Sequence, residues 1–326
     1  MAGFLGRRLR GGTEVDFIGR RRLWYGLSAV LLAVSLAGLV GRGLNLGVEF
    51  EGGSVFTFPR TPGATVAQVR EAVQAAGPGR VIVQTAGSGW RVTTESLDGL
   101  EIAAVRRAVA ERFGVPEHRV STQVIGATWG GEVSRRALLG LAVFLAAITL
   151  YLSVAFEWRM ALAAVVALGH DLVITAGVYA WSGFEVTPAT VLGFLTILGY
   201  SLYDAVVVFD MIKEVTAGPG RSARMTYARA ANAALNRTLV RSLNTSFVAI
   251  LPVAAVLFVG TTLLGAGTLR ELALALFTGM IVGTYSSLCV ATPILVTLKE
   301  REPRWRVPAR GTAGRASAAR ARAARR

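Results

Sequence analysis

Six apolar runs of about 20 residues constrain this chain of 326 residues more than any other feature. A helix of that length spans the hydrocarbon core of a bilayer, where each backbone polar group needs an internal partner. The runs cover residues 23–41, 137–156, 160–182, 188–212, 238–260 and 271–298. The mean hydropathy of +0.51 agrees with them. We therefore predict a bundle of six transmembrane helices and exclude a cytosolic enzyme, a disordered chain and a disulfide-stapled secreted module.

The net charge of +15 is concentrated in the two ends of the chain. Residues 1–22 carry +4 and residues 299–326 carry +8, whereas residues 42–134 sum to zero. Basic segments beside apolar spans mark the cytoplasmic side, with contact to acidic lipid or another partner as the alternative use of the charge. The sequence thus predicts a multi-pass membrane protein, with both termini and the basic segment 213–236 in the cytoplasm and residues 42–134 outside.

Residues 42–134 form the one sizeable water-soluble unit, and hydrophobic periodicity predicts its elements. Strands are expected at 51–58, 80–85, 91–94 and 118–125, and helices at 65–76 and 97–113. The order β-α-β-β-α-β predicts one α+β ferredoxin-like extracytoplasmic domain. The chain then divides into a basic N-terminus (1–22), a first span (23–41), this domain (42–134), spans two to six (135–298) and a basic disordered tail (299–326).

Asp204 lies inside the fourth predicted span, with apolar residues on both sides. An ionisable side chain at the centre of a spanning helix costs about 2.5 to 3.5 kcal/mol, so it needs a reason. Tyr200 and Ser201 lie one turn earlier and can solvate it. The alternative is that Asp204 only hydrogen-bonds a neighbouring helix. Asp210, near the predicted inner surface, fits a solvated helix end.

Two further spans carry ionisable residues. His170 and Asp171 are adjacent in the third span, where a histidine is either an interior hydrogen-bonding group or a proton relay. Arg237 and Arg241 are four residues apart at the start of the fifth span and so share a face, with Thr238 and Ser242 as supporting polar residues. One arginine is expected to reach the membrane surface and the other to pair with Asp204.

An aspartate that alternates between a buried neutral form and an arginine-paired charged form can load and release a proton. The chain has no Walker lysine loop, HExxH, cysteine pair or GxSxG motif, so we expect no enzyme activity, cofactor or metal, and protons as the coupling ion. The single cysteine, Cys289, fits a buried inert thiol.

Five ordered blocks make the chain resemble the SecD/SecF protein-export membrane family, a branch of the resistance-nodulation-division superfamily. They are LNLGVEFEGG (44–53), FEWRMALAAVVALGHDLVIT (156–175), GYSLYDAVVVFDMIKE (199–214), NRTLVRSLNTS (236–246) and LALALFTGMIVGTYSS (272–287). The resemblance maps the essential aspartate of the family onto Asp204 and its arginine onto Arg237. Tyr203, Met211 and Arg241 depart from the family pattern, and Arg241 leaves open which arginine holds Asp204.

The resemblance implies an accessory subunit of the Sec translocase in the bacterial inner membrane, which uses the proton motive force to promote late steps of polypeptide export. It implies SecD as partner beside the SecYEG channel, with YajC or YidC, the translocating polypeptide and lipids as further contacts, and no nucleic acid. Two alternatives remain. The chain could be a proton-coupled exporter subunit for a small molecule or lipid, or a passive scaffold whose buried charges only join helices.

Overall fold

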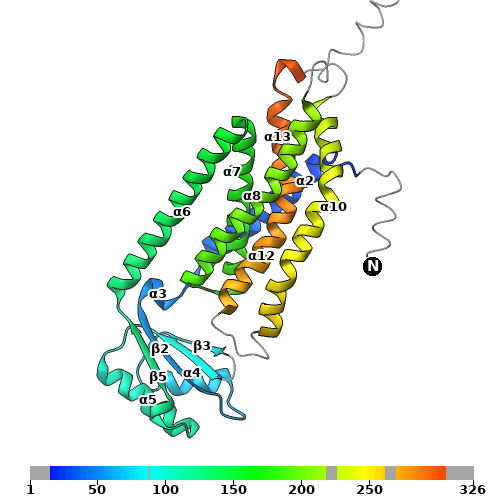
Figure 1. The fold of residues 1–326 in the computed structure, drawn as a ribbon. Helices are drawn as coiled ribbons and strands as arrows, with labels where there is room; N and C mark the ends of the chain where they lie inside the picture. Colours follow the sequence, from blue (N-terminus) through cyan, green and yellow to red (C-terminus); the bar gives the residue numbers. More distant parts are fainter. Residues whose placement is uncertain (1–14, 87–88, 218–225, 261–268, 306–326) are drawn as a thin grey trace, which may run out of the picture.

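The computed structural model describes residues 15–86, 89–217, 226–260 and 269–305 as a helical bundle with a small α/β domain at one end (Figure 1). Six helices of this part are long and apolar enough to cross a membrane. They are α2 (Arg21–Gly41), α6 (Ala127–Ala155), α7 (Trp158–Ser182), α8 (Pro188–Thr216), α10 (Tyr227–Ala254) extended by η2 (Ala255–Gly260), and α12 (Arg270–Ser286) continued by η4 (Ser287–Ala291) and α13 (Thr292–Lys299). The six predicted spans are therefore confirmed as helices.

Helix α6 begins ten residues before the expected start of its span. Residues 127–134, which we assigned to the soluble unit, form its first two turns. They pack on the short helix α3 (Val48–Glu51), and a Cβ on Gly130 would lie 2.5 Å from the carbonyl oxygen of Phe50. This contact joins segments that are far apart in the sequence, so the local sequence of these two turns did not predict it.

Small residues let α8 and α12 approach closely along their length. A Cβ on Gly193 would lie 2.6 Å from the Cβ of Ala275, and one on Gly283 would lie 3.0 Å from the Cβ of Ser201. Gly279, between the two on α12, faces Ile197 in the same way. Without a hydrophobic driving force in lipid, such close backbone contact is a main source of helix association.

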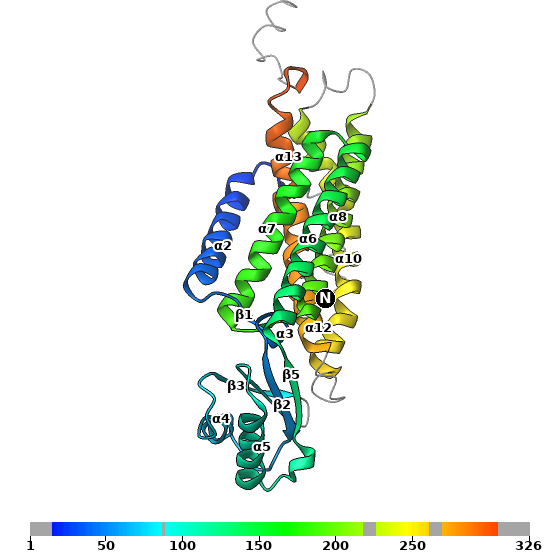
Figure 2. The same ribbon diagram turned by 90° about the vertical axis from the view of Figure 1, so that its left-hand side faces the viewer.

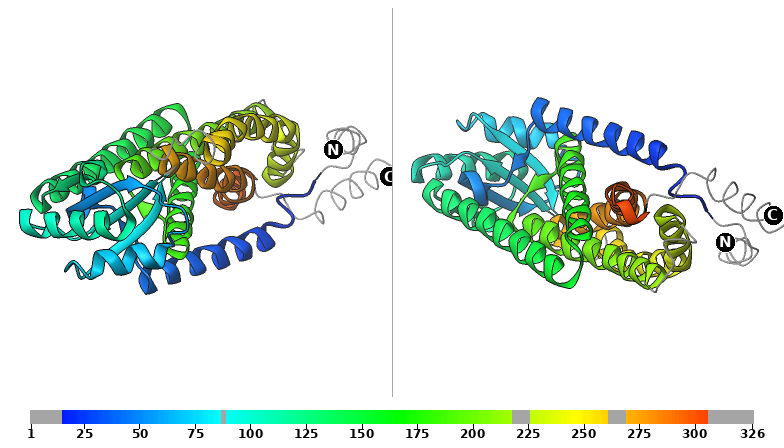
Figure 3. Two further views of the ribbon diagram at one scale, coloured as in Figure 1. Left: turned by 90° about the horizontal axis from the view of Figure 1, so that it is seen from below. Right: turned by 90° about the horizontal axis from the view of Figure 1, so that it is seen from above.

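Helix α2 lies on one flank of the bundle and packs on α7 (Figure 2). Gly177 of α7 makes room for Ser35, and Gly38 of α2 makes room for Trp181. The Trp181 indole donates a hydrogen bond of 2.8 Å to the carbonyl oxygen of Val34. The views along the bundle show α2 as its outermost helix on that side (Figure 3).

The α/β domain, residues 53–125, has the predicted element order. It contains β2 (Gly53–Pro59), α4 (Val66–Gln74), β3 (Val81–Ala86), β4 (Gly89–Thr94), α5 (Gly99–Phe113), the 3₁₀ turn η1 (Glu117–Arg119) and β5 (Ser121–Ile125). The strand order is β3-β4-β2-β5, and all neighbours are antiparallel. The expected boundaries are met within a few residues, except that residues 48–51, partly assigned to the first strand, form α3.

The core of this domain lies between the sheet and its two helices. Trp90 and Phe56 from the sheet and Val69 and Val105 from the helices are all at most 1% exposed. Both helices begin at capping boxes, at Thr65 and Asp98, whose side chains accept backbone N–H groups of the first turn. Each such cap contributes about 1 kcal/mol. Local sequence and burial thus specify the same two helix starts.

Two short strands join this domain to the bundle. Strand β1 (Asn45–Leu46) follows α2 and pairs in parallel with β6 (Glu185–Val186), the connection between α7 and α8. The chain then enters β2 through α3 and returns to the bundle from β5 into α6. The junction is therefore built from both the start of the domain and a loop of the bundle.

The opposite end of the bundle holds the start of α2 and the end of α13, where Arg21 and Glu300 form an ion pair of 2.7 Å. Much of the basic sequence on which the predicted orientation depends lies outside the described residues, namely 1–14, 218–225 and 306–326.

Candidate functional site

Asp171 and Asp204 lie near the middle of α7 and α8 and are 0% and 5% exposed. Burying an ionised carboxylate in a medium of low dielectric constant is costly unless hydrogen bonds or a cation compensate it. Among the described residues, neither aspartate has an Arg or Lys within ion-pair distance. Their compensation comes from hydroxyl groups of neighbouring helices.

Asp204 is held by two serines from two other helical segments. The hydroxyl of Ser242 on α10 donates to Oδ1, and that of Ser287 at the start of η4 donates to Oδ2. Both serines are buried. Each carboxylate oxygen therefore has a short contact to one hydroxyl, so the site joins α8, α10 and η4 through a single side chain.

Asp171 has a matching arrangement. Its Oδ2 accepts hydrogen bonds from Ser201 of α8 at 2.6 Å and from Ser286 of α12 at 2.7 Å. Its Oδ1 lies 3.1 Å from Nδ1 of His170, whose Nε2 is buried without a hydrogen-bond partner in the described part of the chain. Asp171 therefore joins α7, α8 and α12 through one side chain.

Local helix geometry brings the two clusters together. Ser201 and Asp204 are three residues apart on α8 and share a face. Ser286 and Ser287 are adjacent at the point where α12 changes to the π-helical turn η4, and each bonds a different aspartate. Such π turns are common at functional sites. The result is a polar layer of carboxylates and hydroxyls that joins four of the spanning helices, α7, α8, α10 and α12 with η4.

The structure does not bring the two arginines to Asp204. Arg237 and Arg241 are exposed on the outer face of α10, one residue before the buried Thr238 and Ser242. Adjacent helical residues point about 100° apart, so these arginines turn away when the hydroxyls turn inward. The expected Asp204–Arg ion pair is thus absent from this arrangement, and Ser242 occupies the position that we assigned to a guanidinium.

The other predicted residues lie in or beside the polar layer. Ser201 and Ser242 contact carboxylates directly. Tyr200 is half-buried near Ser246 and interacts electrostatically with Asp204. The hydroxyl of Thr238 instead donates to backbone carbonyls of its own helix, at Ala234 and Leu235. Asp210 is exposed, as its position near a helix end suggested.

Sequence reasoning missed the hydroxyls of the last span. Ser286 and Ser287 bond the two aspartates, and Thr284 donates 2.9 Å to Ser246 of α10. The signal was present as a run of Thr, Tyr, Ser and Ser inside an apolar span. Polar residues in a lipid-spanning helix generally face protein partners, so this run deserved the same weight as the charged residues.

A partly buried ion cluster fastens the end of α13 to the turn between α6 and α7. Lys299, 1% exposed, forms ion pairs with Glu157 and Glu302, and Arg159 pairs with Glu302 as well. Opposite charges within hydrogen-bond distance compensate one another here, unlike at the aspartates. We interpret this ion cluster as a structural contact that holds the end of α13 to the turn between α6 and α7.

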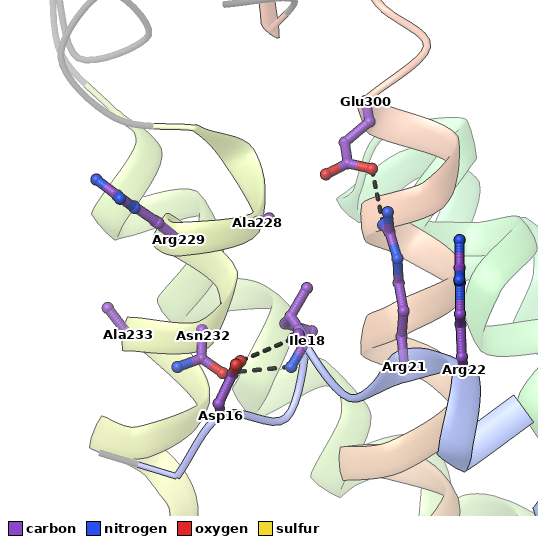
Figure 4. Close-up of a pocket in the computed structure, with 10 residues that line it drawn as sticks. Asp16, Ile18, Arg21, Arg22, Ala228, Arg229, Asn232, Ala233 and Glu300 are labelled. Atoms are coloured by element: carbon purple, nitrogen blue, oxygen red, sulfur yellow. Dashed lines mark hydrogen bonds and ion pairs between the residues drawn. The ribbon is translucent and has the colours of Figure 1, made fainter. Parts of the chain in front are cut away.

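A cavity of about 690 Å³ opens at the same end as Arg21 (Figure 4). Its wall includes Asn232 of α10, whose side-chain oxygen accepts the backbone N–H of Phe17 at 2.9 Å. Asn236 holds Val15 in the same way at 2.8 Å. The cavity therefore marks where the segment before α2 lies on α10. The described residues contain no group of three His, Cys, Asp or Glu side chains placed to hold a metal ion.

Two sequence families match the chain. Residues 106–301 match "Protein export membrane protein SecD/SecF, C-terminal", and residues 37–63 match "SecD/SecF GG Motif". The first match contains Asp171, Asp204 and the serines that bond them. The second contains β1, α3 and the start of the α/β domain.

Curated relatives give the same result. The Protein translocase subunit SecF of Streptomyces coelicolor is 46% identical over 92% of this chain and 81% of that protein. The subunit of the same name from Mycobacterium tuberculosis is 44% identical over 91% and 70%. The crystal structure of SecDF from Thermus thermophilus, titled a translocon-associated membrane protein, has a TM-score of 0.79 and 30% identity. It covers 89% of this chain, which spans 39% of that longer chain.

These matches, together with six apolar helices, show a multi-pass membrane protein. The chain belongs to the SecD/SecF protein-export membrane protein family.

Proposed function

We propose that this member of the SecD/SecF family is an accessory subunit of the Sec protein translocase, which uses the proton motive force to promote late steps of polypeptide export. The relatives named protein translocase subunits support the export role over export of a small molecule or lipid. The observation that supports proton coupling is Asp204, a buried carboxylate held by Ser242 and Ser287 with no cation beside it in the described residues.

The proposed proton switch depends on two faces of α10, one that carries Ser242 and one that carries Arg241. With Ser242 inward, the hydrogen-bond partners of Asp204 among the described residues are hydroxyl groups, so no positive charge compensates an ionised carboxylate there. A rotation of α10 by about 100° would turn Arg241 toward the position of Ser242. Arg237, one turn earlier, would point to the same side. A guanidinium at the site favours the charged form, so the rotation would release the proton.

The polar layer suggests how this step reaches the rest of the bundle. Ser201 lies on the same helix as Asp204 but bonds Asp171, and Ser286 bonds Asp171 beside Ser287. A change at one carboxylate therefore alters the hydroxyl positions available to the other. We propose Asp171 and His170 as the second member of the relay, with no enzyme activity and no cofactor besides the proton.

The α/β domain is, in this proposal, a ferredoxin-like extracytoplasmic domain. Its strand order and its antiparallel pairing support this fold, and the lack of net charge in residues 42–134 supports its side of the membrane. The end of the bundle where Arg21 meets Glu300 is then the cytoplasmic one, and both termini are assigned to the cytoplasm. The 34% identity to a SecDF protein supports SecD as the partner. SecYEG, with YajC or YidC, is the proposed channel-side contact.

Asp204→Asn tests the function, because it keeps the shape of the side chain and removes its titration. Inner-membrane vesicles carrying the variant should lose the stimulation of export by the proton motive force and keep ATP-driven early translocation. Asp210→Asn, on the exposed end of the same helix, is the matched control and should behave like the wild type. Full potential-driven export by Asp204→Asn would make the scaffold interpretation correct.

A further inference from the structure

A second pair of carboxylates lies where the α/β domain meets the bundle. Glu185 belongs to β6 and is 5% exposed, with Asn45 of β1 as its strand partner. Glu49 lies on α3, just after β1. Both are outside the six spanning helices, and neither takes part in the hydrogen bonds of the polar layer around Asp204.

The two sites are separated by their positions in the fold. Glu185 lies in the connection before α8 begins at Pro188, whereas Asp204 lies near the middle of α8. The junction pair is therefore a distinct site at the α/β-domain end of the bundle (Figure 1).

The two carboxylates face one point in space. A Cβ on Gly47 would lie 2.5 Å from Oε2 of Glu49 and 3.1 Å from Oε1 of Glu185. Both of these oxygens are buried, and neither has a hydrogen-bond partner in the described part of the chain. Two unpartnered carboxylate oxygens this close together repel one another when both groups are ionised, and one shared proton removes the repulsion.

The surrounding charged and polar groups come from three other elements. Arg91 of β4 lies 3.4 Å from Oε1 of Glu49, and Gln84 of β3 interacts with Glu185. Arg270 and Glu271 of α12 line a cleft of about 270 Å³ beside Glu185. Burial raises the pKa of Glu185 above its usual value, Arg91 opposes this rise, and Glu49 and Glu271 add to it. The cleft gives water a path to the carboxyl group.

We propose that Glu185 and Glu49 form a proton-binding site that fastens the α/β domain to the bundle. Arg91 and Gln84 belong to the domain, whereas Glu185 belongs to a loop of the bundle, so the site exists only while the two parts are together. Because the assembled site raises the pKa of Glu185, protons favour the assembled state. This fastening is fully present below the ordinary pKa of a glutamate and weakens as the pH rises through the raised value.

The test measures the distance between the two parts in the full chain, reconstituted in lipid nanodiscs. Spin labels are placed at Leu100→Cys on α5 and Val40→Cys on α2, both highly exposed, in a Cys289→Ala background. The wild type should give one narrow distance distribution at acidic pH and a broader one as the pH rises. Glu185→Gln mimics the protonated form and should stay narrow throughout. Glu111→Gln, exposed on α5, should behave like the wild type.

A second variant and a second measurement keep the proposal testable if Glu185→Gln fails to fold. Glu49→Gln removes the neighbouring negative charge and should lower the midpoint of the transition by roughly one pH unit. Infrared difference spectra of the wild type should show a protonated carboxyl band that Glu185→Gln lacks. A wild-type distribution that does not change with pH, or an unchanged transition in Glu185→Gln, would overturn the proposal. Neither the distance measurement nor the infrared measurement depends on export, so this test is independent of the role of Asp204.

Discussion

Ser286 and Ser287 are neighbours in sequence, yet their hydroxyls bond different aspartates, Asp171 on α7 and Asp204 on α8. The change from α12 to the π-helical turn η4 occurs at this pair. A single helical segment therefore contacts both buried carboxylates. In the proposed mechanism, the junction of α12 and η4 would carry a change at one aspartate to the other.

Ser287→Ala should destabilise the protein, because it removes one hydrogen bond from a buried carboxylate. Loss of a hydrogen bond to such a group costs about 1.5 to 3 kcal/mol. The thermal midpoint in detergent should fall accordingly. Ser153→Ala is the control, since Ser153 is exposed on α6 and bonds only the carbonyl oxygen of Thr149 in its own helix. Equal midpoints for the two variants would contradict a stabilising role for Ser287.

Gly193→Ala should loosen the contact between α8 and α12. The added Cβ would lie 2.6 Å from the Cβ of Ala275, so the helices must move apart. Close packing is a main source of helix association in lipid, and overpacking costs about 1 to 3 kcal/mol. Gly140→Ala on α6 adds a Cβ with nothing within 4 Å and should leave the thermal midpoint unchanged or raise it. The contact interpretation fails if both variants behave alike.

The sequence predicted the long helices and the α/β element order because both depend on local periodicity. Apolar runs identify spans, and the capping residues Thr65 and Asp98 mark helix starts. It did not predict the partners of Asp204. That choice depends on the rotation of α10, which decides whether Ser242 or Arg241 faces inward, and rotation is set by packing against other helices. The early start of α6 was missed for the same reason.

The α/β domain should fold by itself as residues 52–126, the range set by α3 and α6. Val109, 0% exposed on α5, is the test of its core. Val109→Ala should lower the free energy of unfolding by about 2 kcal/mol in urea titrations. Leu100→Ala, 84% exposed on the same helix, should change it by less than about 0.5 kcal/mol. Amide NMR signals without dispersion would show that this segment does not fold alone.

Arg237 and Arg241 provide the sharpest test of the α10 switch, because both are exposed in this arrangement of the helices. Arg237→Met and Arg241→Met should therefore leave the thermal midpoint near that of the wild type. If α10 rotates during coupling, Arg237→Met should abolish potential-driven export, as Asp204→Asn does. Arg241→Met should have a milder effect if Arg237 is the residue that pairs with Asp204.

A cross-linking measurement separates rotation of α10 from a purely structural role of its arginines. Cysteines in place of Ser242 and Ser287 should cross-link readily at rest, because both hydroxyls bond the same carboxylate. Cysteines in place of Arg241 and Ser287 should cross-link only when a proton gradient is imposed, since Arg241 lies about 100° away around the helix. Cross-linking of the second pair that is independent of the gradient would exclude a gated rotation and leave Ser242 as the permanent partner of Asp204.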